Sequence, residues 1–486
     1  MPAKAPLNRK KKQETHDDLC AVILAAGEGK RMHSSKPKVL LEVLLKPMLG
    51  WVVDAAHHAG IDDICVVTGH KEDMVKKYLG PEVMTVTQTE RKGTGHAVMM
   101  AREFLEAHRG GKVLIACGDA PFLNFKTVKH ALEQHKARED AVTVISASLT
   151  DPTGYGRIIR EDDGSLLRIV EQKEGTLEEL SVREVNSGTY WFDIDALLEV
   201  LDPIHLKESG ITGEHYLTDS ISALIEIGYG AGAYSASSPD VVMGANNPVQ
   251  LHELNEIARE RFITKQVVLG ANIPCYDGVI IGPDVTVGPD TSILPGSVIT
   301  GVTNIGSGCT IGPNATIHDS NIGDNVMVTY SHIKESTVLS GSDVGPFAQI
   351  RPGSVVGQNV HLGTFVEVKN SNIGDGTQVA HLAYIGDTDM GSDVNFGCGS
   401  ITVNYDGKNK HRTTIGDNAF IGCNTNLIAP LTIGTRAVTA AGTTVTADVP
   451  DGDMAIGRVR QENKSGWAEE RRSDFNVLPV IQPEEK

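Results

Sequence analysis

The sequence predicts two domains of different class: an α/β Rossmann-like domain first, then a left-handed parallel β-helix. The first prediction depends on apolar runs that alternate with helical patterns, and the second on a six-residue repeat. From residue 281 onward, a small apolar residue recurs at every sixth position. The first members are Ile281, Val287, Ile293, Ile299, Ile305, Ile311 and Ile317. A fixed short period of this kind is typical of a solenoid.

Six residues suffice for one short flat strand and a turn, and three such units close a triangular coil. The repeated Ile or Val points inward and stacks on the coil below, while Gly allows corner conformations that a Cβ would obstruct. The pattern slips near Asn321 and then returns as Val344, Ile350, Val356, Leu362, Ile373, Val379, Ile385, Ile415, Ile421, Leu427 and Ile433. The handedness is an exception to the usual right-handed crossover. A β-sandwich with irregular strands is the alternative, and the strict register argues against it.

The first half of the chain alternates apolar runs with helical patterns. The predicted strands are Leu19–Ala26, Ile64–Thr68, Val83–Thr87, Val113–Cys117 and Val142–Ser148. The predicted helices are Met48–Ala59, Gly95–His108 and Asn124–Ala137. Such alternation predicts a parallel sheet with helices on both faces. Ligands of such sheets bind beyond the carboxyl ends of the strands, so we expect a site at that edge.

Length and composition exclude several classes of protein. A chain of 486 residues is too long for one ordinary domain, and a net charge of −18 argues against a nucleic-acid partner. No apolar stretch approaches the roughly 20 residues that span a membrane, and the N-terminus lacks the apolar core of a signal peptide. We therefore expect no membrane insertion. The seven cysteines are odd in number and scattered, which predicts reduced thiols in a cytoplasm.

These patterns divide the chain into five predicted segments. They are a disordered polar extension (1–18), the α/β domain (19–246), an amphipathic linker helix (247–268), the β-helix domain (269–460) and a C-terminal tail (461–486). The linker is predicted because Leu251, Leu254, Ile257, Ala258 and Phe262 recur at helical spacing.

Two features at predicted strand ends suit a phosphate-bearing ligand. The loop Leu24–Met32 contains two glycines, which let backbone N–H groups approach phosphate oxygens, and Arg31 and Lys38 add positive charge. A tight turn would explain the glycines equally well. Asp119 follows the fourth predicted strand, where a lone carboxylate suits a hard cation such as Mg²⁺, although it could equally cap a helix.

Motifs in both halves of the chain together resemble one known family. In the first half these are Leu24–Met32, Pro37–Leu40, Gln88, Gly93–His96, Asp151–Arg157, Glu171, Asn186–Gly188 and Gly244–Asn247. In the second half they are Arg351–Pro352, Lys369, His381–Asp387 and Asn404–Gly407. In order and spacing, the chain from Leu19 to Arg458 resembles the bacterial bifunctional N-acetylglucosamine-1-phosphate uridylyltransferase/glucosamine-1-phosphate N-acetyltransferase family.

The resemblance implies two reactions in one chain. The β-helix domain would acetylate the amine of glucosamine 1-phosphate with acetyl-CoA. The first domain, a pyrophosphorylase, would then join the product to UMP from UTP and release pyrophosphate. The final product, UDP-N-acetylglucosamine, is a precursor of peptidoglycan and lipopolysaccharide. The resemblance also implies a homotrimer formed through the β-helix domain.

For uridylyl transfer, the resemblance implies that Arg31 and Lys38 stabilise the charge that moves to pyrophosphate, and that Asp119 and Asn246 hold Mg²⁺. The expected UTP and UDP-sugar positions are Leu24, Ala25, Ala26, Gly27, Lys38, Gln88, Gly93, Thr94, Cys117, Gly118, Asp119, Gly156, Glu171, Asn186 and Asn246. Gln88, Gly93 and Thr94 would line the uracil, and Gly156, Glu171 and Asn186 would hold the sugar. The nucleophile is an anionic phosphate oxygen, so positioning and charge neutralisation carry this reaction. Lys30 stands where the family has a small hydroxyl residue.

For acetyl transfer, a base is needed because only a neutral amine attacks a thioester, and His is the natural choice. The resemblance assigns this role to His381, although an isolated His is more often structural. The expected sugar-phosphate positions are Arg351, Lys369, Tyr384 and Asn395, and the expected acetyl-CoA positions are Cys398, Asn404, Tyr405, Cys423, Ala441 and Arg458. Cys398 and Cys423 stand where Ala and Ser are common, and a thiol is a poor hydrogen-bond donor. The stretch Asn404–Arg412 breaks the repeat and predicts a loop that covers a neighbouring subunit's site.

Two other functional classes stay open from the sequence. One is a monofunctional nucleotidyltransferase whose repeat half is only a scaffold. The string around His381, together with Lys369 and Arg351, argues against it. The other is a metal-dependent β-helix enzyme of the carbonic-anhydrase type, in which His361, His381 and a third His would bind a metal. That class leaves the first half of the chain unexplained.

Overall fold

The computed structural model describes residues 18–90, 92–201 and 215–471. The chain forms two compact units, Met1–Arg261 and Phe262–Lys486. The predicted extension 1–18 lies outside the described residues except for its last residue, and the predicted tail 461–486 is described only as far as residue 471, including α10 (Trp467–Glu470).

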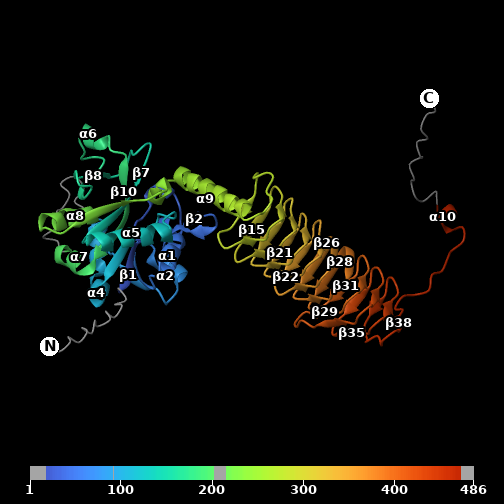
Figure 1. Ribbon diagram of the computed structural model, residues 1–486. Coiled ribbons are helices and arrows are strands. Elements are labelled where there is room, and N and C mark those ends of the chain that lie inside the picture. The colour runs from blue at the N-terminus through green and yellow to red at the C-terminus, as the bar shows by residue number, and fades with distance from the viewer. Residues whose placement is uncertain (1–17, 91, 202–214, 472–486) are drawn as a thin grey trace, which may run out of the picture. The chain divides into compact units, whose positions relative to one another are not determined.

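The first unit is built on one sheet that carries helices around it (Figure 1). The strand order of this sheet is β11-β7-β10-β6-β1-β4-β5. The strands are β1 (Leu19–Leu24), β4 (Asp63–Thr68), β5 (Met84–Thr87), β6 (Lys112–Cys117), β7 (Val142–Ser148), β10 (Glu184–Asp193) and β11 (Ala231–Ser235). Strand β1 is parallel to β4 and β6, so Leu24 and Cys117 pair at the same edge. Strand β10 runs antiparallel to β6 and β7. The five predicted strands therefore share one direction, as expected, and β10, which was not predicted, makes the sheet mixed.

Helices cover both faces of this sheet and enclose two separate apolar cores. One core includes residues of α1 (Met48–His58), α2 (Glu72–Leu79) and α5 (Phe125–Arg138). The other includes residues of α3 (Thr94–Met100), α4 (Arg102–Ala107), α7 (Ile194–Val200) and α8 (Leu217–Glu226). The single helix expected over 95–108 is two helices, which meet at Ala101. Smaller elements complete the unit: β2 (Glu42–Val43), β3 (Lys46–Pro47), β8 (Arg157–Arg160), β9 (Leu166–Val170) and α6 (Leu177–Leu180).

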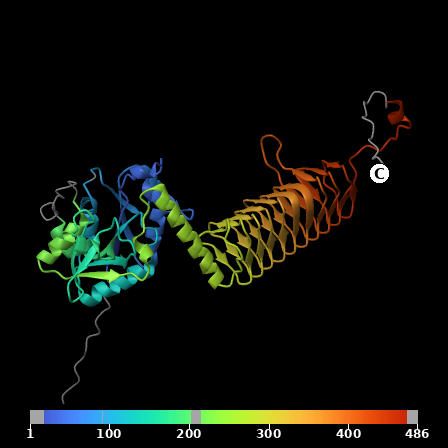
Figure 2. The same cartoon turned by 90° about the horizontal axis from the view of Figure 1, so that it is seen from above.

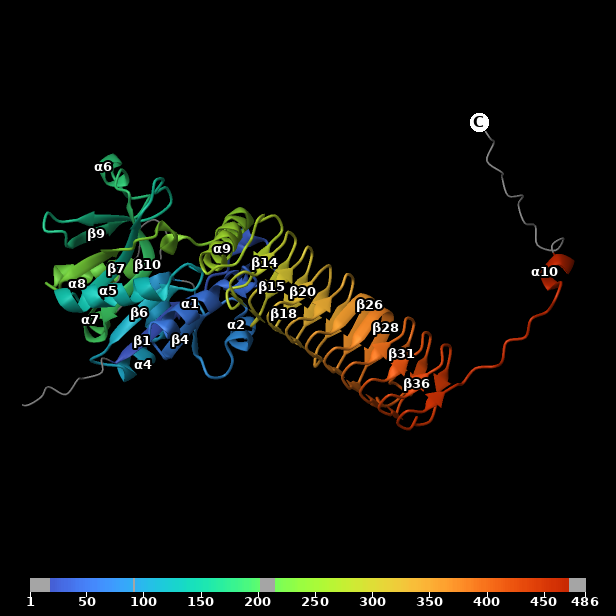
Figure 3. The same cartoon turned by 45° about the vertical axis from the view of Figure 1, so that its right-hand side comes forward.

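The second unit is a left-handed parallel β-helix that runs from β12 (Ile280–Ile281) to β38 (Met454–Ala455) (Figure 3). Each strand pairs in parallel with the strand one coil later. Ile281 pairs with Ile299, and Val287 pairs with Ile305. Three six-residue repeats make one coil, and each repeat supplies one strand of that coil. Strands in the same position of successive coils therefore stack, and the β-helix has three faces.

We call these faces 1, 2 and 3. Face 1 holds β24 (Gln349–Arg351), the second halves of β26 (His361–Lys369) and β28 (Gln378–Gly386), β31 (Ile401–Val403) and β34 (Asn426–Ile428). Face 2 holds the first halves of β26 and β28, then β30 (Asn395–Phe396), β33 (Phe420–Ile421) and β36 (Val438–Thr439). Face 3 holds β27 (Asn372–Ile373), β29 (Thr388–Met390), β32 (Thr413–Ile415) and β35 (Leu431–Ile433). The edge where the chain passes from face 2 to face 1 is called the 2–1 corner below.

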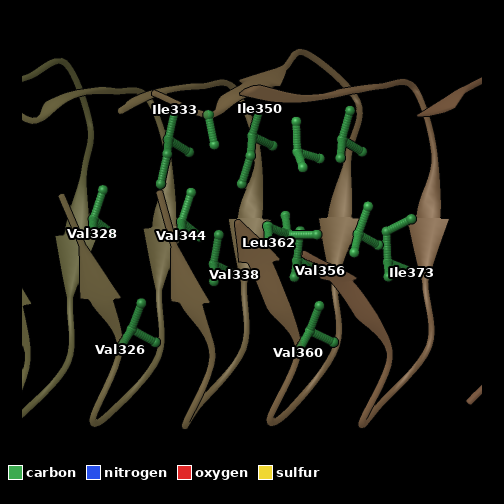
Figure 4. Close-up of a cluster of buried hydrophobic side chains, with 14 of the residues drawn as sticks. Val326, Val328, Ile333, Val338, Val344, Ile350, Val356, Val360, Leu362 and Ile373 are labelled. Atoms are coloured by element: carbon green, nitrogen blue, oxygen red, sulfur yellow. The ribbon is translucent and has the colours of Figure 1, made fainter. Parts of the chain in front are cut away.

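The repeated aliphatic residues form a continuous core inside the coils (Figure 4). Val328 pairs with Val344, which pairs with Leu362 one coil later, and all three are buried. The slip near Asn321 is not a break in the β-helix. Buried residues continue there as Ile317, Ile322, Val328, Ile333 and Val338, at steps of five or six residues. A corner can therefore lose one residue while the next inward side chain keeps its place.

One corner carries an insertion. Gln378 pairs with Asn395, 17 residues later, whereas Asn395 pairs with Phe420, 25 residues later. The additional residues form the loop 404–412 between β31 and β32, as the broken repeat predicted. Figure 2 shows this loop projecting from the orange part of the β-helix.

The helix α9 (Pro248–Val268) spans the division between the two units. Its last turns belong to the second unit, where Ile263 is part of the apolar core and the Gln266 side-chain amide donates a hydrogen bond to the Val285 carbonyl oxygen. Across the described ranges, no helix combines the length and the apolar character that crossing a membrane requires.

Two candidate active sites

A cavity of about 290 Å³ lies at the carboxyl end of β1. Its lining is Leu24, Ala26, Gly27, Gln88, Gly93, Thr94, Ala97 and Tyr216. Six of these residues are among the nucleotide positions expected from the sequence. Tyr216 was not expected, because it follows Thr94 by more than a hundred residues. The Leu217 backbone N–H donates to the Thr94 hydroxyl at 2.9 Å, which brings this segment to the cavity.

The Gln88 side chain is almost fully buried in this cavity wall, and its orientation is fixed. Its amide nitrogen lies 3.0 Å from the Gly93 carbonyl oxygen and 3.0 Å from Nδ1 of His96. Burial and the Lys92 ammonium lower the pKa of His96, which favours a neutral ring that accepts this hydrogen bond. Gly93 has a φ of +98°, and a Cβ there would lie 2.4 Å from the His215 carbonyl oxygen. Position 93 therefore requires glycine.

A second cavity of about 370 Å³ opens beyond the ends of β1 and β6. Its lining is Arg31, Cys117, Asp119, Ala120, Thr153, Gly154, Tyr155, Ser187, Val242, Gly244, Asn246, Asn247 and Gln250. It brings together Arg31, Asp119 and Asn246, which come from three distant parts of the chain. Burial, with the Asp119 carboxylate nearby, raises the pKa of the Cys117 thiol to about 12, so this thiol stays protonated.

The Lys38 ammonium joins the two expected metal ligands. It donates to the Asn246 amide oxygen at 2.7 Å and forms an ion pair with Asp119. A carboxylate and an amide oxygen that converge on one cation are the hard donors that Mg²⁺ prefers, so these residues fit a divalent cation. Among the described residues, a separate group of possible ligands, Asp18, Asp63 and His108, lies at the opposite edge of the sheet, beside the starts of β1 and β4.

The three expected sugar positions also converge. The Asn186 backbone N–H donates to the Gly156 carbonyl oxygen at 2.9 Å, and a Cβ on Gly156 would lie 3.4 Å from the Glu171 carboxylate. Burial raises the pKa of Glu171, and the nearby Glu174 and Asp219 carboxylates add to the shift. Lys30, the departure from the family pattern, is mostly exposed, and its ammonium lies 3.5 Å from the Glu28 carboxylate.

The expected base of the second reaction, His381, is exposed at the 2–1 corner. Cys398, Cys423 and Ala441 occupy the same corner on the next three coils. The Asn424 backbone N–H donates to the Cys398 carbonyl oxygen, and the Gly442 backbone N–H donates to the Cys423 carbonyl oxygen, each at 2.8 Å. Four expected residues thus form one straight ladder. The Arg458 side chain continues it, since its Cδ lies 4.0 Å from a Cβ built on Gly442.

Face 1 separates this ladder from the expected phosphate-binding residues. Arg351 pairs with Lys369 at the far edge of the face, and Tyr384 lies between that edge and the 2–1 corner. The Arg351 guanidinium donates to the Glu367 carboxylate at 2.7 Å. Asn395 lies on face 2, so the corner separates it from Tyr384. The structure therefore gathers three of the four expected sugar-phosphate positions on face 1.

Asp387 organises the far edge of face 1. Its carboxylate lies 3.7 Å from the Lys369 ammonium and accepts hydrogen bonds from the side-chain amides of Asn370 and Asn404. Burial opposes the ionisation of Asp387, but these hydrogen bonds and the Lys369 charge outweigh it and hold the pKa of Asp387 below its usual value. Asn404, an expected acetyl-CoA position, is thus fixed beside the expected phosphate-binding residue Lys369.

The loop 404–412 is an ordered hairpin that starts at this edge. The Asp406 carboxylate accepts hydrogen bonds from the Asn409 and Lys408 backbone N–H groups and from the His411 ring, and these bonds lower the pKa of Asp406. The neighbouring Lys369 ammonium lowers the pKa of Lys410. Lys410 therefore brings a second positive charge beside Lys369. No motif in the sequence signals this role for Lys410, because only the fold of the loop returns it to this edge.

Two known families match parts of this chain. The family described as Nucleotidyl transferase matches residues 20–239, and the family described as GMPPB C-terminal domain matches residues 263–373.

The relatives match nearly the whole chain. The bifunctional protein GlmU of Caldanaerobacter subterraneus subsp. tengcongensis is 48% identical over 94% of this chain and 98% of its own length. GlmU of Thermoanaerobacter pseudethanolicus has the same identity and coverage. GlmU of Acetivibrio thermocellus is 44% identical over 92% of this chain and 97% of its own length. The chain belongs to the family of bifunctional GlmU proteins.

Proposed function

We infer that this chain is a bifunctional enzyme of UDP-N-acetylglucosamine biosynthesis. It acetylates glucosamine 1-phosphate with acetyl-CoA and then transfers UMP from UTP to the product. The main support is that one chain holds both the residues expected for uridylyl transfer and those expected for acetyl transfer. Each of the two sets gathers at one place in its own domain. The nucleotide set lines two cavities at the strand ends, and the acetyl-transfer set lies along face 1 and the 2–1 corner. We propose that residues 19–246 carry uridylyl transfer, that 247–268 form the linker and that 269–460 carry acetyl transfer.

In uridylyl transfer, Asp119 and Asn246 would hold Mg²⁺, and Lys38 and Arg31 would neutralise the phosphates. The contacts of Lys38 with both oxygen ligands support this arrangement. The bound metal would neutralise charge that develops on the departing pyrophosphate. Gln88, Gly93 and Thr94 would recognise the base, and Gly156, Glu171 and Asn186 would hold the sugar. No general base is needed, because the attacking phosphate oxygen is already an anion.

In acetyl transfer, Arg351, Lys369 and Lys410 would hold the phosphate of glucosamine 1-phosphate at one edge of face 1. The amino group would then point across Tyr384 toward His381, which removes a proton as the amine attacks the thioester. Acetyl-CoA would run along the 2–1 corner past Cys398, Cys423 and Ala441 to Arg458. The ladder of these residues in register supports this path.

We propose that the protein is a homotrimer formed through the β-helix domain. The 2–1 corner exposes large apolar side chains on four successive coils, namely Tyr330, Phe347, Phe365 and Leu382. Phe347 stacks on Phe365 with ring centroids 5.7 Å apart, and Tyr330 lies 5.7 Å from Phe347. A continuous exposed apolar ladder next to His381 is the kind of surface that another subunit covers. We also propose a cytoplasmic location, where the substrates UTP and acetyl-CoA are made.

The test is incubation of the protein with glucosamine 1-phosphate, acetyl-CoA, UTP and Mg²⁺, followed by identification of the products. We expect free CoA, pyrophosphate and UDP-N-acetylglucosamine. Omission of acetyl-CoA should leave glucosamine 1-phosphate unconverted, while supplied N-acetylglucosamine 1-phosphate should still react with UTP. Formation of a UDP-sugar only from N-acetylglucosamine 1-phosphate would contradict the acetyltransferase assignment.

A further inference from the structure

Two of the seven cysteines, Cys398 and Cys423, are exposed on adjacent coils. Asn395 pairs with Phe420 and Phe396 pairs with Ile421, so the register places Cys398 directly opposite Cys423. Each cysteine occupies the first residue of a two-residue turn at the 2–1 corner. The hydrogen bond from the Asn424 backbone N–H to the Cys398 carbonyl oxygen ties the two turns together.

The spacing of the coils suits a disulfide. Neighbouring strands lie about 4.8 Å apart, and disulfides join residues whose Cα atoms are roughly 4.4–6.8 Å apart. Matching positions in stacked turns direct their side chains to the same side of the β-helix. Rotation of two exposed side chains would therefore bring the sulfur atoms together, with no change of coil register.

Four of the five other cysteines are poor candidates for thiol chemistry, and the fifth, Cys275, is partly exposed. Cys20, Cys65 and Cys309 are buried. Burial raises the pKa of Cys20 and Cys65 to about 12, and it also raises the pKa of Cys309. A thiol that stays protonated reacts slowly with disulfides, because the thiolate is the nucleophile. Oxidation by a small disulfide should therefore select the exposed pair.

We propose that Cys398 and Cys423 form a reversible disulfide across adjacent coils, which closes the acetyl-CoA end of the acetyltransferase site. The prediction that the bond forms depends only on the register of the coils. The prediction that it affects acetyl-CoA depends also on the proposed function. His381 occupies the same corner one coil earlier, and Ala441 occupies it one coil later. The bond would thus cross the middle of the proposed acetyl-CoA path, and it would replace two thiols by a rigid bridge that has no hydrogen-bond donor.

The reaction is a thiol–disulfide exchange with a low-molecular-weight disulfide such as glutathione disulfide. The thiolate of one cysteine attacks the small disulfide, forms a mixed disulfide and releases one glutathione thiol. The thiolate of the other cysteine then attacks the protein sulfur of that mixed disulfide. This step forms the bond between Cys398 and Cys423 and releases the second glutathione. Two electrons pass from the protein to the small disulfide, and the two protein protons end on the released thiols.

The experiment compares the full-length protein in excess glutathione with the same protein in excess glutathione disulfide. Peptide mass mapping under non-reducing conditions measures the cross-link, and separate assays measure acetyl and uridylyl transfer. We expect a peptide pair joined through Cys398 and Cys423, a loss of acetyl transfer of about tenfold or more, and unchanged uridylyl transfer. Dithiothreitol should restore acetyl transfer.

Three variants control this result: Cys398→Ala, Cys423→Ser and Cys275→Ser. Each is scored by its acetyl transfer after oxidation relative to its own acetyl transfer before oxidation, so a changed basal rate does not enter. The first two should form no cross-link and stop at a mixed disulfide on the remaining cysteine, which peptide mass mapping identifies and dithiothreitol removes, while Cys275→Ser should form the cross-link as the wild type does. Absence of the cross-link from an oxidised, folded protein, or a cross-linked protein with full acetyl transfer, would overturn the proposal. A reduced protein without acetyl transfer would instead contradict the proposed function, and the cross-link would still decide whether the disulfide forms.

Discussion

The two units of this protein assemble their sites in different ways. In the α/β unit, the ammonium of Lys38 meets Asp119 and Asn246, which come from widely separated parts of the chain. In the β-helix, His381, Cys398, Cys423 and Ala441 lie together because each occupies the same turn of a successive coil. The first site depends on the packing of a whole sheet and its helices. The second depends mainly on coil length, so a local change should disturb it locally.

Among the variants that test whether the two sites are independent, His381→Ala is expected to change a reaction rate most. Loss of a general base costs about 10²–10⁴-fold, so acetyl transfer should fall by that factor while uridylyl transfer persists. The matched control is His361→Ala. His361 lies on face 2 rather than at the 2–1 corner, and its ring forms a hydrogen bond with the Asp343 carboxylate. Acetyl transfer at the wild-type rate in His381→Ala would remove His381 from the mechanism. An equal loss in both variants, with zinc present in the pure protein, would favour a metal centre.

Asp119→Ala should have the converse effect. Without this carboxylate the cation would lose a ligand, and uridylyl transfer should fall by about 10²–10³-fold, as when a charge-stabilising group is removed. Acetyl transfer should stay near the wild-type rate. Asp62→Ala, at the opposite edge of the sheet, serves as the control, and coupled assays on both variants provide the measurement. If both activities fell together in folded Asp119→Ala, the separation of the two sites would be wrong.

Phe347→Asp tests whether the β-helix site needs neighbouring subunits. A carboxylate placed in the exposed aromatic ladder would be buried without a partner in a trimer, which is strongly unfavourable. We expect light scattering to report monomers, acetyl transfer to fall at least about tenfold, and uridylyl transfer to continue. Val302→Asp, at another corner, is the control because Val302 is also largely exposed. A fully active monomer would refute a site shared between subunits.

The smallest effect is expected from removal of Met1–Asp17. Every residue assigned to either site follows Leu19, so both activities should match those of the full chain within measurement error. Steady-state assays of the two proteins side by side provide the test. A large loss of one activity would reveal a contribution of this segment to that site alone.

Sequence reasoning was most successful where position along the chain translates directly into position in space. The apolar residues at six-residue steps are the buried core of the β-helix, and the break after Val403 is the loop 404–412. The three steps of five residues, which end at Ile322, Ile333 and Val338, escaped the six-residue pattern. A corner that is one residue shorter keeps the inward residue in place but shifts its position in the repeat.

In the α/β unit, the five predicted strands run in one direction as expected, but strands β10 and β11 were not predicted. Strand β10 has buried side chains facing both cores, as a parallel strand would have, and its antiparallel direction depends on the path of the chain around it. Tyr216 was missed for a related reason. It reaches the cavity at the carboxyl end of β1 through a contact between Leu217 and Thr94, and nothing local at Tyr216 signals that contact.

The loop 404–412 has a consequence for how this protein can change. Coils on either side of it keep their pairing, since Ile401 pairs with Asn426 and Thr413 with Leu431 as if no residues had been added. A corner of a β-helix is therefore a place where chain length can vary freely, because each coil contacts only its neighbours. New recognition elements can be grafted at such corners, one coil at a time, while the stacked interior stays as it is. Substrate range in this half of the molecule can thus evolve by insertion, whereas in the α/β half it must evolve by substitution within a shared core.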